Sequence, residues 1–169
     1  MKKSIFGFLL SIIFAFTVSA QKPEARKIDE FGDHPCSLVL NAVPAYYVAM
    51  GEIPGSTLFI IYYEGKHFKE NVWNKKLKSY ESKWVYPRRG DALNRAKEVG
   101  LVAKDNKFSV ENLVYVNGGY REKFTLEIWL VPPGAAQPEP ASTLTETDVT
   151  FEKGKPVRPR LCARIYDGL

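Results

Sequence analysis

Several residue types that carry recognisable chemistry are scarce in this sequence. It contains two cysteines, Cys36 and Cys162, and two histidines, His34 and His67, whose spacing matches no zinc site. It also lacks a G-x-S-x-G turn, an H-E-x-x-H helix and a glycine-rich loop that could hold phosphates. We therefore expect no catalytic residues, no metal and no cofactor.

Long hydrophobic runs are absent after the first twenty residues. Residues 1–20 carry two lysines, then an apolar run over 5–16, then a small-residue ending, which is the pattern of a secretory signal. The apolar run is shorter than the roughly 20 residues that a spanning helix needs. We expect cleavage after Ala20 and a periplasmic or secreted protein with no transmembrane segment in its mature chain.

Export would also decide the state of the two cysteines. An oxidising compartment permits a disulfide between Cys36 and Cys162, which would close a long loop. The alternative is two separate thiols, one in the core and one on a loose tail. The sequence leaves both open.

Apolar periodicity predicts one α+β domain over residues 21–134. The run LFIIYY at 58–63 is typical of a central strand that is buried on both faces. From Asp91, apolar residues recur at three- and four-residue steps, which predicts an amphipathic helix with Asp91 as a cap. We also expect strands at 28–31, 113–116 and 124–131, and a helix that starts near Asn41 with Pro44 in its first turn.

The chain after Gly134 changes in composition. Residues 135–147 are rich in Pro, Ala, Ser and Thr, as in a linker. Residues 148–169 form a basic segment with two short apolar pieces. If the disulfide forms, this last segment folds back on the domain.

Taken in order, the expected elements resemble the C-terminal domain of the outer membrane protein A family. The resemblance lies in LFIIYYEG, in the helix ALNRAKEVG, in FSVENLVYVNGG and in the closing strand TLEIWLV. The chain is also similar to a divergent set of exported bacterial proteins of unknown function that share the arginine-alanine helix, a GGYRE hairpin and an E-L-W-V-P-like ending. The resemblance implies a two-layer β-α-β-α-β-β sandwich and a module that binds peptidoglycan.

The same resemblance implies two ligand-binding residues. Typical members hold the diaminopimelate unit of the wall peptide with an aspartate just after the central strand and an arginine on the next helix. Arg95 matches the arginine, whereas Glu64 stands in place of the aspartate and is one methylene group longer. The alternative for Arg95 is a solvated surface group or a partner of Glu98.

Two further segments contain accessory candidates. Residues 66–89 form a basic, aromatic excursion, in which Lys75, Lys76, Trp73 and Trp84 could contact an anionic polymer, lipid head groups or a sugar; the alternative is a solvated loop that covers the sheet edge. NGGYRE at 117–122 predicts a hairpin turn. Tyr120 and Arg121 are then flanking surface groups or, alternatively, part of a polar recognition patch.

These features predict an exported, non-catalytic cell-envelope binding module for peptidoglycan or another anionic envelope polymer. The alternatives are a structural or protein-interaction domain whose wall-binding site has been lost and, last, an exported hydrolase. Nucleic acid is not an expected partner in that compartment. The sequence does not define the oligomeric state.

Overall fold

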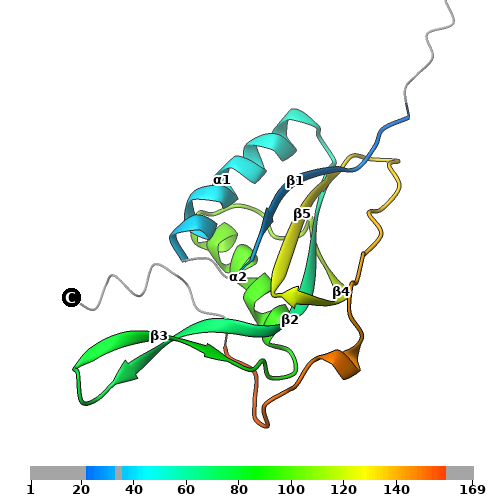
Figure 1. Cartoon of the computed structure of the whole chain (residues 1–169). Helices are drawn as coiled ribbons and strands as arrows, with labels where there is room; N and C mark the ends of the chain where they lie inside the picture. The colour runs from blue at the N-terminus through cyan, green and yellow to red at the C-terminus, as the bar shows by residue number, and fades with distance from the viewer. Residues whose placement is uncertain (1–21, 33–35, 159–169) are drawn as a thin grey trace, which may run out of the picture.

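Two helices and five strands form an α+β fold in the computed structural model, which describes residues 22–32 and 36–158 (Figure 1). The α+β class predicted from the sequence is confirmed. The predicted signal segment and Cys162 lie outside the described residues, and so does the predicted disulfide. The elements are β1 (Arg26–Phe31), α1 (Cys36–Glu52), β2 (Thr57–Asn74), β3 (Ser79–Val85), α2 (Asp91–Asp105), β4 (Leu113–Lys123), β5 (Thr125–Val131) and the short 3₁₀ helix η1 (Glu146–Asp148).

β2 is the centre of a mixed sheet with the strand order β1-β5-β2-β4. It pairs antiparallel with β5 over 57–63 and parallel with β4 over 58–67, and β1 pairs antiparallel with β5. Most side chains of its apolar run at 58–63 are buried. The predicted central strand is therefore confirmed.

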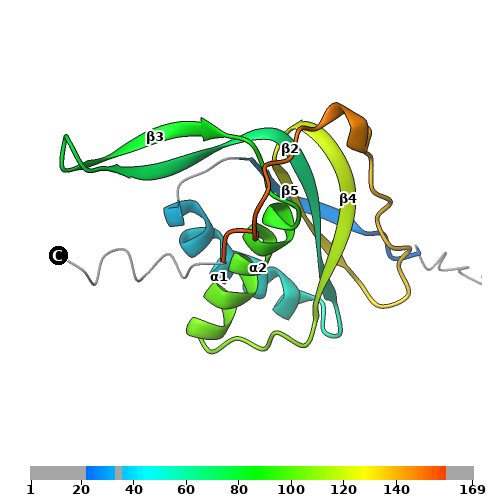
Figure 2. The ribbon, with the colours of Figure 1, turned by 90° about the horizontal axis from the view of Figure 1, so that it is seen from below.

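Both helices cover one face of this sheet (Figure 2). α2 presents alanine and valine to the sheet, and such small side chains let a helix approach closely. The core between the two layers contains Val39, Val43 and Tyr46 of α1, Ala92, Ala96, Val99, Val102 and Ala103 of α2, and Leu58, Ile60, Leu126 and Ile128 of the sheet.

The chain that follows β5 returns along the β4 side of the sheet (Figure 1). The backbone N–H of Ala141 donates to the hydroxyl of Tyr63 at 3.1 Å. The N–H groups of Thr143 and Leu144 both donate to the carbonyl oxygen of Tyr120. Residues 135–147 have the composition of a linker, yet their backbone groups find partners on the sheet, so this segment is a strap and not a free connection.

Residues 117–122 do not form the predicted hairpin turn, because β4 continues through them to Lys123. Its pairing with β2 shifts register at Gly118, so the two glycines lie at a bulge. Gly119 has φ +86°, and a Cβ on Gly118 would lie 2.3 Å from Cε1 of Tyr63. The glycines thus allow a bulge and a close ring contact inside a strand.

The link from β4 to β5 crosses over β2 at Gly65. A Cβ at this position would lie 2.1 Å from the backbone nitrogen of Phe124. Beyond the crossing, β2 leaves the sheet and pairs antiparallel with β3 from Phe68 to Asn74. The predicted excursion is therefore a two-stranded arm that projects from the domain (Figure 1).

The first helix is longer than the sequence predicts. α1 begins at Cys36, and Pro44 lies inside it rather than in its first turn. An interior proline removes one helical hydrogen bond. Val39, Val43 and Tyr46 are nevertheless buried against the core on both sides of this position, and their packing stabilises the helix across the proline.

Candidate functional site

A pocket of about 220 Å³ opens at the N-terminus of α2, between the end of the central part of β2 and the bulge of β4. Four different parts of the chain meet there, since Phe151, a few residues after the strap, also reaches it. The side chains that define its chemistry are Tyr62, Glu64, Arg89, Asn117, Tyr120 and Phe151.

Glu64 places a buried carboxyl group in this pocket. It follows the apolar run of β2, pairs in register with Tyr120 of β4 and is 8% exposed. Its Oε2 accepts a hydrogen bond of 3.3 Å from the backbone N–H of Ala92 in α2. Burial raises the pKa of Glu64 to about 7, although the hydrogen bond from Ala92 acts in the opposite direction. A cation in the pocket would therefore favour the ionised carboxylate.

Arg89 places a positive charge at the rim of the pocket. Its guanidinium pairs with Glu146 of η1 and lies 4.6 Å from the ring centre of Phe151. The side chain is 67% exposed, so an incoming carboxylate could reach it and compete with Glu146. Arginine suits this exchange because its planar group binds carboxylates through two parallel hydrogen bonds.

Tyr120 lies where these charges converge. Burial raises the pKa of its hydroxyl, and the charge of Glu146 and a hydrogen bond with that residue raise it further, while Arg89 lowers it. Its ring also meets Phe151 edge-on, with 6.3 Å between centroids. The pocket thus combines a carboxyl group, a guanidinium group and aromatic side chains around one small volume. Such a set can hold a ligand that carries both an ammonium and a carboxylate group.

Arg95 lies outside this pocket, although its charge lowers the pKa of Glu64. Its guanidinium carbon is 4.0 Å from the ring centre of Phe68 and 5.3 Å from that of Phe124, and its Nε atom is buried. Glu64 and Arg95, the two residues named by the resemblance, are therefore electrostatic neighbours, but only Glu64 lines this pocket.

Arg121 belongs to a buried cluster on the other face of the sheet. Its guanidinium stacks on Tyr63 at 3.6 Å and donates to Oε1 of Glu127 at 2.9 Å. Oε2 of Glu127 also accepts from Tyr63 and Trp129. Burial raises the pKa of Glu127, but hydrogen bonds from Trp129 and Arg121 outweigh this and lower it. Arg121 is neither a flanking surface group nor part of the pocket, because this cluster holds the sheet and the strap together.

The remaining accessory candidates lie on the arm, away from the pocket. Lys75 and Lys76 are exposed near its tip, and Trp84 is 59% exposed. Trp73 lies in β2 opposite Tyr80 of β3, and its side chain is outside the described part of the structure. The structure brings none of these described arm residues to Glu64.

Sequence reasoning missed most of the pocket. Tyr62 lies in the predicted central strand and Arg89 lies just before the predicted helix, but nothing in the sequence shows that β2, α2, β4 and Phe151 meet. Phe151 lies about sixty residues after Arg89, so their contact is a product of the fold. The available signal was an arginine pair and a glycine immediately before an amphipathic helix.

Comparison with protein-family models, with curated proteins and with solved structures finds no match for this chain. Among the described residues, no helix is long and apolar enough to span a membrane. The same residues contain no cluster of three or more His, Cys, Asp or Glu side chains that could hold a metal ion.

Proposed function

We propose that this protein is an exported, non-catalytic binding module of the cell envelope, whose pocket takes the amino-acid end of a peptidoglycan side chain. The observation that carries the proposal is the pocket itself, with a buried carboxyl group from Glu64 and an accessible guanidinium from Arg89. An amino-acid end offers the matching ammonium and carboxylate groups. Diaminopimelate in a wall peptide has such an end.

Each half of this ligand has a physical reason to bind. The ammonium group would pair with Glu64 between the walls formed by Tyr62 and Tyr120, where burial strengthens the attraction. The carboxylate would pair with Arg89 in place of Glu146. Two opposite charges that line one small cavity select a zwitterion over a simple cation or anion.

The element order supports the resemblance to the outer membrane protein A family. With the arm strand β3 set aside, the chain reads β-α-β-α-β-β, as the resemblance implies. Glu64 follows the apolar run of β2 and Arg95 lies on the next helix. In this chain Arg89 would take the role of carboxylate partner, while Arg95, which does not line the pocket, lowers the pKa of Glu64.

Sedimentation with purified peptidoglycan sacculi tests this function. We expect wild-type protein to sediment, and free diaminopimelate to release it. Glu64→Gln and Arg89→Gln should each weaken binding about 10- to 100-fold, because each removes one charged hydrogen bond. Arg88→Gln is the matched control, since Arg88 pairs with Glu152, which follows the strap, and does not line the pocket. Unchanged sedimentation of both pocket variants would exclude this site.

The second candidate is a structural or protein-interaction domain without wall binding. The packing of Arg95 against Phe68 and Phe124 favours it, because this arginine does not reach the pocket. The two candidates differ in one result. A wild-type protein that does not sediment with sacculi at low salt would support the structural domain.

A further inference from the structure

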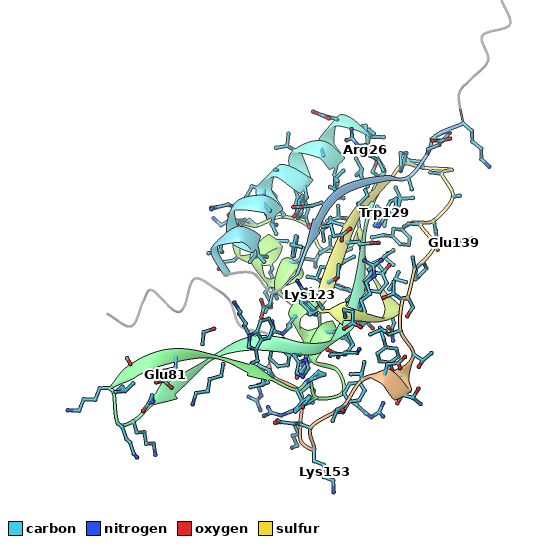
Figure 3. The ribbon with its side chains drawn as sticks, in the orientation of Figure 1. Arg26, Glu81, Lys123, Trp129, Glu139 and Lys153 are labelled. Atoms are coloured by element: carbon cyan, nitrogen blue, oxygen red, sulfur yellow. The ribbon has the colours of Figure 1, made fainter. Side chains whose placement is uncertain are left out.

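The arm built from the second half of β2 and from β3 projects beyond the sheet and both helices (Figures 1 and 2). Its root is fixed to the domain by Phe68, which is 3% exposed. Figure 3 shows side chains that stand away from the arm, near the labelled Glu81, with no second layer over them. A two-stranded ribbon is marginally stable in water by itself. An arm of this kind therefore gains from a surface outside the domain.

The net positive charge of the chain is concentrated on this arm. Residues 68–85 contain five lysines and two glutamates, a surplus of +3. The chain without residues 1–20 has the same net surplus of +3, so the rest of it is neutral in total. Three of the five lysines, Lys75, Lys76 and Lys78, lie at the tip of the arm. The arm thus presents its charge at the point that is farthest along the ribbon from the domain.

The arm also carries aromatic and apolar residues in unusual positions for an exposed ribbon. The pairing register sets Lys69 opposite Trp84 and Trp73 opposite Tyr80. These four positions share one face of the ribbon because alternate residues of a strand lie on the same face. Trp84 is 59% exposed, with the ammonium of Lys69 at 5.1 Å from its ring, and Leu77 at the tip is 64% exposed.

Lysines on an exposed edge strand have an ordinary function, which is to prevent pairing with other chains. That function does not require an exposed leucine between lysines or a row of aromatic positions. A soluble anionic polymer would use the lysines but offers no apolar phase for Leu77. A bilayer interface uses all three features, because tryptophan and tyrosine prefer the head-group region and lysines bind anionic lipids.

We propose that this arm docks on the surface of a bilayer that contains anionic lipid head groups. Leu77 enters the head-group boundary, the face with Trp84 lies against the interface, and the lysines of the tip pair with lipid phosphates. This site is separate from the pocket at Glu64. If both are occupied, the protein connects a membrane surface to the cell wall.

Co-sedimentation with vesicles tests the docking surface. We expect the whole protein to bind vesicles of phosphatidylglycerol and phosphatidylcholine, and to bind pure phosphatidylcholine much more weakly. The triple variant Lys75→Gln/Lys76→Gln/Lys78→Gln should bind about a hundredfold more weakly, because each lysine near an anionic surface contributes about a factor of several. The control Lys97→Gln/Lys104→Gln/Lys153→Gln removes the same charge from exposed positions elsewhere and should bind as wild type does.

Leu77→Ser separates a bilayer from an anionic polymer. The variant keeps every charge, so it should bind a soluble polyphosphate like wild type and bind anionic vesicles several-fold more weakly. Tryptophan fluorescence should shift to the blue with anionic vesicles, and Trp84→Phe should reduce this shift. Equal binding of wild type and Leu77→Ser to vesicles would overturn the proposal in favour of a polymer, and absence of vesicle binding by wild type would overturn it outright.

The two proposals fail independently. Glu64→Gln leaves the arm intact and should bind vesicles normally, while the triple lysine variant leaves the pocket intact and should still bind sacculi. Circular dichroism of each variant checks that its fold is preserved.

Discussion

The carboxyl group of Glu64 caps the first turn of α2 by accepting a hydrogen bond from the backbone N–H of Ala92. The residue before the helix is a glycine without a side chain to do this. Asp91, the cap predicted from the sequence, instead accepts from the N–H groups of Arg88 and Val157. The group that would meet the ligand therefore also joins β2 to α2.

We predict that Glu64→Gln flattens the dependence of stability on pH. Because the pKa of Glu64 is raised from 4.5 to about 7, the folded protein holds a proton that the unfolded chain releases between these values. The free energy of unfolding should then fall as pH rises from about 4.5 to 7, by on the order of 3 kcal/mol. Urea unfolding of wild type and Glu64→Gln at several pH values measures the difference.

The control for this measurement is Glu111→Gln, which changes an exposed glutamate. The free energy of unfolding of this variant should depend on pH in the same way as that of wild type. At about pH 8 the Glu64→Gln protein should be more stable than wild type. Its glutamine can accept the hydrogen bond from the backbone N–H of Ala92 and carries no buried charge. If the free energy of unfolding of wild type rises between pH 5 and 7 relative to that of Glu64→Gln, the pKa of Glu64 is not raised.

Ligand binding should show the opposite pH dependence. An ammonium group binds the ionised form of Glu64, and the ionised fraction of a group with a pKa of about 7 rises steeply around neutrality. We predict that the affinity for a diaminopimelate-containing peptide rises about tenfold between about pH 6 and pH 8. Calorimetric titration measures this, and Glu64→Gln should bind weakly with no such rise. An affinity that is flat over this range would show that Glu64 does not contact the ligand.

Gly118→Ala should destabilise the fold by at least about 2 kcal/mol. The new methyl group would meet the ring of Tyr63, which has no exposed surface and cannot move without disturbing the cluster beneath the strap. Gly51→Ala is a matched control at a helical position with nothing within 4 Å; it should be neutral or stabilise by up to about 1 kcal/mol. Thermal unfolding of the two variants compares them directly, and equal melting temperatures would contradict the close packing at the bulge.

The parts of the fold that could be predicted depend on local pattern. The run at 58–63 is apolar at every position, which is typical of a central strand, and the period of α2 gives its start at Asp91. The Gly-Gly bulge was read as a turn because a turn is the common local use of glycine. Its actual cause is the ring of Tyr63 in a parallel neighbour more than fifty residues earlier, which no local pattern contains.

The candidate site was predictable to a smaller degree. The resemblance singles out Glu64, just after the apolar run of β2, and this position holds a buried carboxyl group in the pocket. Phe151 reaches the same pocket because the strap before it turns back along β4, and there it contacts Arg89 just before α2. The strap has few apolar residues, and its position is set by backbone hydrogen bonds that have no sequence signature.

The pair Arg121 and Glu127 should be essential for stability and not for binding. Both side chains are largely buried, at 17% and 7% exposed, so removal of Arg121 takes away the nearest cation of Glu127 and leaves it only Lys27, at 3.5 Å. We predict that Arg121→Ala lowers the free energy of unfolding by about 2 to 4 kcal/mol, somewhat below the range for fully buried pairs. Arg121→Lys should recover little of this loss, because lysine cannot stack on Tyr63 and bind the carboxylate in the same geometry.

A double-mutant cycle with Glu127→Gln isolates the pair from the rest of the cluster. The double variant should lose less free energy of unfolding than the two single variants do in sum. The second change removes the buried carboxylate that has lost its arginine partner. The pKa of Glu127 is lowered, so its contribution is present above about pH 5 and is lost as the pH falls through the folded-state pKa. The coupling measured by urea unfolding should therefore shrink in acid. Strict additivity at neutral pH would mean that Arg121 stabilises the sheet through Tyr63, Ala141 and Glu30 and not through Glu127.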